Sequence, residues 1–77
     1  MKKTVLIIDD DVRLSEVLSR RFKTKTDYLV HCYSSASEAL AHEPQSVFAV
    51  ILDMMLEDEI GLEFISQLKT HFLPEHL

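Results

Sequence analysis

The sequence predicts an α/β fold, with three strand and helix pairs on one parallel sheet in the strand order 2-1-3. Two runs, TVLII (residues 4–8) and VFAVIL (residues 47–52), are apolar but for one threonine, which is typical of strands covered on both faces. Segments with helical spacing of apolar residues alternate with the strands, and this alternation predicts parallel strands with crossover connections. A chain of 77 residues has room for one domain, residues 1–77.

The first strand and helix are predicted at residues 4–8 and 12–23. Asp11 stands where a helix N-cap is needed, because a carboxylate there accepts hydrogen bonds from free backbone amides. Four apolar residues recur at helical spacing and predict a helix face packed on the sheet: Leu14, Val17, Leu18 and Phe22.

The second strand and helix are predicted at residues 28–33 and 36–42. The strand has mixed polarity, which suits the edge of a sheet, and it contains the single cysteine, Cys32. One cysteine excludes an internal disulfide, and we expect a small buried side chain there. Ser35 and Glu38 form a capping-box pattern at the start of the helix.

The third strand and helix are predicted at residues 47–52 and 62–71. Because the first strand is wholly apolar after its threonine and the second is mixed, the first is placed in the centre, next to the third. The apolar third strand then has no neighbour on its outer edge, and exposed apolar edges pair with other strands. The chain is therefore expected either to be a fragment of a larger domain or to pair with a second copy along that edge.

Acidic residues follow the first and third strands directly. Asp9 and Asp10 come after residues 4–8, and Asp53 comes after residues 47–52. The carboxyl ends of neighbouring parallel strands lie side by side at the edge where ligands bind. Grouped carboxylates repel one another unless a cation is bound, and an oxygen-only site suits Mg²⁺. We therefore predict a site for Mg²⁺ and a phosphoryl group, with Asp53 as the reacting residue.

The composition indicates which classes of partner and which cellular location to expect for the protein. The formal net charge is −5 and the eight basic residues are scattered, which argues against direct nucleic-acid contact by this segment. The apolar run near the start is too short for a signal peptide or a membrane span. We expect a cytoplasmic protein that does not contact a membrane.

Three stretches of the chain resemble the receiver domain of two-component response regulators, a family with a flavodoxin-like fold. VLIIDDD resembles the first strand and acidic pair of the family, YSSASEAL its second helix, and VILDMMLEDEIGLEFISQL its phosphoacceptor strand, loop and third helix. The spacing from Asp53 to Gly61 is also that of the family. By this resemblance the chain is a phosphoacceptor signalling domain, which at most catalyses its own phosphorylation.

The resemblance also implies roles for individual residues. Asp53 would be the phosphoacceptor, and Asp9 and Asp10 the pair that positions Mg²⁺, with Met55 a ligand through its backbone carbonyl. The phosphodonor would be a sensor histidine kinase. Glu57 stands where the family usually has proline, which adds charge beside the site.

The resemblance covers only the N-terminal portion of the family, a partial flavodoxin-like (βα)3 unit. Strands four and five, with a switch threonine or serine and a lysine that contacts the phosphoryl group, would lie beyond Leu77. By this resemblance, residues 1–77 are a truncated receiver domain, impaired in phosphorylation and switching.

Two other functions are compatible with parts of the pattern. Asp9 and Asp11 resemble the nucleophile motif of haloacid-dehalogenase-type phosphohydrolases, although that motif leaves Asp53 and Gly61 unexplained. A self-association module, pairing through the edge of the strand at residues 47–52, is the other alternative, and it would give a homodimer.

Overall fold

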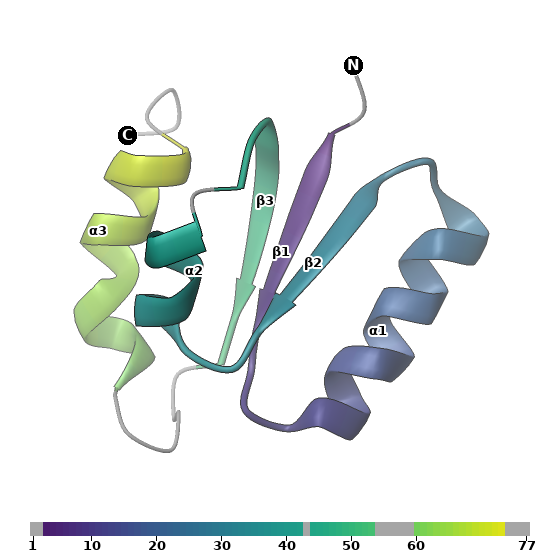
Figure 1. Ribbon diagram of the computed structural model, residues 1–77, viewed down its shortest axis with the longest axis horizontal. Coiled ribbons are helices and arrows are strands. Elements are labelled where there is room, and N and C mark those ends of the chain that lie inside the picture. The colour runs from purple at the N-terminus through teal and green to yellow at the C-terminus, as the bar shows by residue number, and fades with distance from the viewer. Residues whose placement is uncertain (1–2, 43, 54–59, 74–77) are drawn as a thin grey trace.

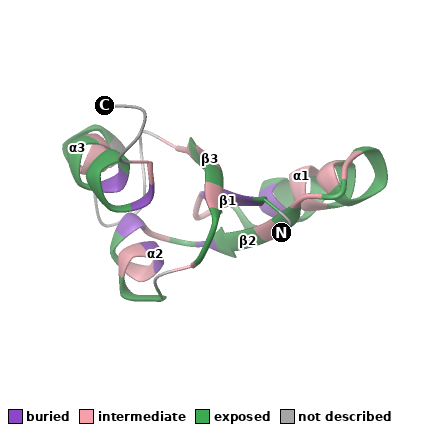
Figure 2. Ribbon diagram, turned by 90° about the horizontal axis from the view of Figure 1, so that it is seen from above, coloured by how far each residue is buried: buried purple, intermediate pink, exposed green. Residues whose placement is uncertain are grey.

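The computed structural model shows a small sheet between two layers of helix (Figure 1). The structure describes residues 3–42, 44–53 and 60–73. The elements, in chain order, are β1 (Thr4–Ile8), α1 (Val12–Lys25), β2 (Leu29–Tyr33), α2 (Ala36–His42), β3 (Val47–Leu52) and α3 (Gly61–Phe72). Helix α1 lies on one side of the sheet, and α2 and α3 lie together on the other (Figure 2).

The sheet has the order β2-β1-β3, with both neighbours parallel to β1. The predicted fold class and strand order are confirmed. Small differences lie at the ends of elements: α1 continues to Lys25 rather than residue 23, β2 begins at Leu29, and α3 runs from Gly61 to Phe72. Each difference is one or two residues, the range over which helix and strand ends are usually uncertain.

The central strand β1 is the most buried element of the described chain, and it appears purple between its more exposed neighbours in Figure 2. Leu6 and Ile8 point to the α2 and α3 side, where they form the main core. The buried residues that pack with them there are Tyr33, Ala36, Ala39, Leu68 and Phe72. Val5 and Ile7 are also buried, and strand alternation turns them to the side of α1.

The pairing of β1 with β3 contains one irregularity near its start. Thr4 pairs with Val47 and Val5 with Ala49, so one residue of β3 is skipped. Ser46, directly before β3, has a φ of 58°, and its carbonyl accepts a hydrogen bond of 2.9 Å from the Thr4 amide. From Val5 onward the register is regular, and it ends with Ile8 opposite Leu52.

Two predictions about side-chain burial are wrong. Leu14 and Val17 of α1 are 45% and 51% exposed, because the helix turns its small Ser15 rather than these residues toward the strands. Cys32 is exposed rather than buried, because β2 is an edge strand that α1 covers only in part. The prediction that β2 is an edge strand is confirmed, because β2 stands at one end of the strand order β2-β1-β3.

The start of α1 allows a direct test of local stability. The Asp11 carboxylate accepts a hydrogen bond of 3.2 Å from the Leu14 amide, as an N-cap does. We expect Asp11→Ala to lower the free energy of unfolding by about 1 kcal/mol, measured by urea denaturation. Asp11→Asn keeps a capping oxygen and removes the charge, so it is the matched control. Equal effects of both variants would show that charge, and not the cap, is what matters at this position.

Candidate functional site

The ends of β1 and β3 place Asp9 and Asp53 beside each other. Ile8 and Leu52 are register partners, and the next residue of each strand is an aspartate. The Asp53 amide donates a hydrogen bond of 2.9 Å to the carbonyl of Ile8, which extends the β1–β3 pairing to Asp53 itself. On the other side, the Asp9 amide donates to the Tyr33 carbonyl at 3.0 Å. The backbone therefore ties Asp9 to the end of β2 and Asp53 to the end of β1.

Three carboxylates gather at this point. Asp9, Asp10 and Asp53 each offer one oxygen, and these oxygens all lie within 4.8 Å of one another. All three side chains are partly exposed, so an ion can approach them from solvent. Oxygen-only ligation by a few carboxylates is what Mg²⁺ prefers, since this ion keeps several water ligands. The residues present therefore fit the ion that the sequence predicts.

Asp11 has a separate role from its two neighbours. Its carboxylate caps α1, and its amide donates a hydrogen bond of 2.9 Å to Oδ1 of Asp9. That bond fixes one oxygen of Asp9 in the turn between β1 and α1. Asp11 thus stays the N-cap that the sequence predicts and is not a member of the group of three carboxylates.

A hollow of about 440 Å³ adjoins the carboxylates, with an apolar wall. Leu14 and Leu18 of α1 and Ile51 of β3 form much of this wall. In the part of the chain that the structure describes, no lysine or arginine lines the hollow. Sequence reasoning missed the wall, although helical spacing identified Leu14 and Leu18 as apolar, because it assigned them to packing on the sheet.

The predicted backbone ligand Met55 and the acidic residues around Glu57 lie outside the described residues. The remaining predicted site residues, Asp9, Asp10 and Asp53, are those that the structure brings together.

Comparison with known proteins identifies the family. The family described as response regulator receiver domain matches residues 5–76 of the chain. The chain belongs to this family. A curated protein, regulatory protein VanRc from Enterococcus gallinarum, is 26% identical over 76 residues, which are 96% of this chain and 32% of that protein. The chain thus spans about a third of the length of this relative. The comparison with solved structures found no significant match.

Membership in the family makes this a signalling domain of the two-component type rather than a typical enzyme. Among the described helices of this receiver domain, none is long and apolar enough to cross a membrane.

The crowding of the three carboxylates has a measurable consequence for stability. Two unit charges 4.8 Å apart repel by about 1 kcal/mol in bulk water and by about 3 kcal/mol at an effective dielectric of about 20. We expect Asp10→Asn to raise the free energy of unfolding by about 1 kcal/mol in metal-free buffer of low ionic strength, measured by urea denaturation. Salt should reduce this gain because it screens exposed charges.

Asp27→Asn removes one exposed acid outside the group and is the matched control, for which we expect no comparable gain. If Asp10→Asn destabilised the metal-free protein, the repulsion argument would be wrong.

Proposed function

We propose that this receiver domain accepts a phosphoryl group from a sensor histidine kinase onto Asp53, with Mg²⁺ held by Asp9, Asp10 and Asp53. The observation that supports this most strongly is the gathering of these three carboxylates at the ends of β1 and β3, in a chain of the receiver family. A kinase partner of this kind would place the domain in the cytoplasm.

The proposed reaction is a transfer between two phosphorylated side chains. A carboxylate oxygen of Asp53 attacks the phosphorus of the kinase phosphohistidine. The phosphorus–nitrogen bond breaks as an acyl phosphate forms, and the histidine leaves with the electron pair of that bond. When bound, Mg²⁺ supplies positive charge that offsets the charge of the phosphoryl group. The backbone bond from the Asp53 amide to Ile8 keeps the attacking residue at the strand end while this happens.

We further propose that the 77 residues alone accept phosphate slowly. A phosphoryl group brings about −2 charge into a site that already holds three carboxylates. No cationic side chain lines the adjoining hollow in the described part of the chain, so the described residues around the carboxylates offer little to offset this charge.

Intact-mass measurement tests the phosphoacceptor directly. We expect incubation with Mg²⁺ and acetyl phosphate to add one phosphoryl group that hydroxylamine removes, because acyl phosphates are cleaved by this nucleophile. Asp53→Asn should abolish the gain, since an amide is not a nucleophile of comparable strength. Asp11→Asn is the control, because it changes a nearby acid that serves as the helix cap, and it should keep the gain.

The same experiment separates the receiver from a phosphohydrolase of the haloacid-dehalogenase type. A phosphohydrolase would carry its intermediate on Asp9 and would keep the label after Asp53→Asn. Retention of a hydroxylamine-labile phosphoryl group in Asp53→Asn would therefore contradict the proposed assignment.

A second function is supported by the outer edge of β3. In the described chain β3 pairs with β1 alone, and its Phe48 and Ile51 are 41% and 38% exposed. We propose that two copies pair antiparallel along this edge. Lys3, whose Nζ lies 4.7 Å from the centre of the Phe48 ring, would then approach the acidic end of the partner strand. Because the pairing is antiparallel, this contact between Lys3 of one copy and the acidic strand end of the other would form at both ends of the paired strands.

Sedimentation equilibrium tests this pairing. We expect the apparent mass to rise from monomer to dimer with protein concentration, and Ile51→Lys to shift the rise to higher concentration because lysines on an edge oppose pairing. Val17→Lys, which places the same charge on the exposed part of α1, is the control. A strict monomer at high micromolar concentration would exclude the homodimer.

A further inference from the structure

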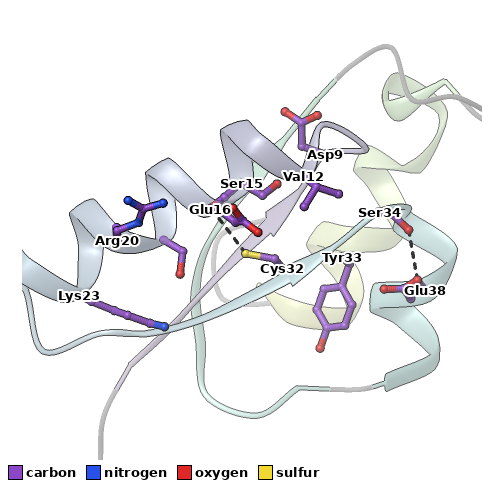
Figure 3. A pocket seen from close by; sticks show the side chains of 11 residues that line it. Asp9, Val12, Ser15, Glu16, Arg20, Lys23, Cys32, Tyr33, Ser34 and Glu38 are labelled. Atoms are coloured by element: carbon purple, nitrogen blue, oxygen red, sulfur yellow. Dashed lines mark hydrogen bonds between the residues drawn. The ribbon is translucent and has the colours of Figure 1, made fainter.

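Helix α1 covers β2 and leaves β3 largely open on its side of the sheet. A groove of about 580 Å³ lies between α1 and β2, and Ser15 and Cys32 are among the residues that line it (Figure 3). The Cys32 thiol donates a weak hydrogen bond of 3.9 Å to the Ser15 carbonyl, marked by a dashed line in Figure 3. Phe48 and Ile51 of β3, by contrast, are exposed. The open part of this face is therefore the outer edge of β3, which leads directly to Asp53.

The backbone of β3 presents two residues to a further strand. The Asp53 amide donates its hydrogen bond inward, to the Ile8 carbonyl of β1. Because the backbone groups of successive strand residues point in opposite directions, those of Leu52 and Val50 point outward, away from β1. Among the described residues, no strand lies beyond β3. Such an edge pairs readily with another strand.

One antiparallel register matches β3 to a second copy of itself. Directly opposed residues of antiparallel strands have their side chains on the same side of the sheet. Val50 and Leu52 pack on the core beside α2 and α3, whereas Asp53 faces the side of α1. Opposing Val50 to Leu52 of the second copy would match the sides and let these residues exchange backbone hydrogen bonds. Ile51 would then lie on the two-fold axis, and Asp53 would lie opposite Ala49 of the second copy.

This register would bring Lys3 beside Asp53 of the second copy. Nζ of Lys3 lies 4.7 Å from the centre of the Phe48 ring, so the side chain reaches across β3. Phe48 directly precedes Ala49, and the second copy lies one strand spacing away, about 4.8 Å. A register shifted by two residues would place Asp53 opposite Val47, on the other side of Phe48, and would keep Lys3 beside it.

Within one copy, Lys3 is too far away to serve the candidate site. Lys3 precedes β1 and Asp9 follows it, so their Cα atoms are about 20 Å apart at about 3.3 Å per residue. No lysine or arginine of the described chain lines the hollow beside the carboxylates. A phosphoryl group of about −2 charge on Asp53 would therefore gain from an ammonium group that a second copy brings.

We propose that Lys3 of a second copy contacts the phosphoryl group on Asp53, so that each site of the dimer is built from two chains. This contact rests on the phosphoacceptor role of Asp53 and on the pairing of β3 proposed for the two copies. By thermodynamic reciprocity, a contact that stabilises the phosphorylated site in the dimer also strengthens the dimer when Asp53 is phosphorylated.

Mixing two variants tests whether Lys3 acts from the second chain. Lys3→Gln keeps the acceptor without the ammonium group, and Asp53→Asn keeps the ammonium group without the acceptor. The reagents are Mg²⁺ and acetyl phosphate, from which acetate leaves with the electron pair of the broken phosphorus–oxygen bond. At high micromolar protein we expect Lys3→Gln alone to be labelled about three- to tenfold more slowly than the wild type. An excess of Asp53→Asn should restore most of the rate, and intact mass identifies the labelled chain.

Two controls separate this contact from general effects of charge. The double variant Lys3→Gln/Asp53→Asn pairs through the same edge without an ammonium group, so the same excess should not raise the rate. Lys25→Gln removes a lysine from the last residue of α1 and should stay within about twofold of the wild type. Restoration by Asp53→Asn also shows that the Lys3→Gln chain is folded.

The outcomes distinguish the two-chain site from the proposals on which it rests. No phosphoryl gain by the wild type at any concentration would contradict the phosphoacceptor and the two-chain site together. A gain by a strict monomer would exclude the pairing and the two-chain site but keep the phosphoacceptor. A gain by a wild-type dimer, with Lys3→Gln equally fast or with no restoration in the mixture, would overturn the two-chain site alone.

Sedimentation velocity tests the reciprocal effect on the dimer. With Mg²⁺ and acetyl phosphate kept in the buffer, we expect wild-type dimers to form at a concentration at least threefold lower than without acetyl phosphate. Lys3→Gln should show no such shift. An equal shift in Lys3→Gln would show that phosphorylation strengthens the dimer without Lys3, and it would overturn the proposed contact.

Discussion

The parallel pairing of β1 with β3 is the constraint on which the candidate site depends. Ile8 and Leu52 are partners in this pairing, and a hydrogen bond from the Asp53 amide to the Ile8 carbonyl continues it by one residue. Side chains alternate between the faces of a sheet, so a slip of one residue would turn Asp53 away from Asp9. The apolar residues of β1 and β3 that pack on α3 fix the register, and the register in turn sets the spacing of the carboxylates.

Burial of the core stabilises this small protein, whereas repulsion between the carboxylates of the site destabilises it. A chain of 77 residues buries a limited core, here centred on Leu6 and Ile8, and it also holds three carboxylates within 4.8 Å. The repulsion between those acids acts against a modest stability. A bound cation would remove this repulsion, and under the proposed function the same cation would prepare the site for a phosphoryl group. In this account, ligand binding and the stability of the β1–β3 edge are therefore coupled.

Much of this arrangement could be predicted from the sequence because it depends on local patterns. The apolar runs of β1 and β3, the alternation of strands with helices and the position of Asp11 before α1 each specify their element without knowledge of the rest. The gathering of Asp9, Asp10 and Asp53 follows from the strand order together with the parallel register of β1 and β3. The loop that contains Met55 lies outside the described residues, so its predicted carbonyl ligand stays a prediction.

What could not be predicted depends on how elements rotate against one another. Helical spacing identifies an apolar face on α1, but it does not say that Ser15 turns toward the strands while Leu14 and Val17 stay exposed. The exposure of Cys32 likewise depends on how much of the edge strand β2 the helix covers.

Paramagnetic broadening by Mn²⁺ in a ¹⁵N-labelled sample tests most directly whether the β1 and β3 ends form one cation site. Mn²⁺ favours the same oxygen ligands as Mg²⁺ and broadens amide signals close to it. The account predicts that the amides of Asp9, Asp10 and Asp53 broaden together at low Mn²⁺ and that Mg²⁺ restores them. Broadening centred on acids elsewhere, or on only one of the two strand ends, would contradict the account.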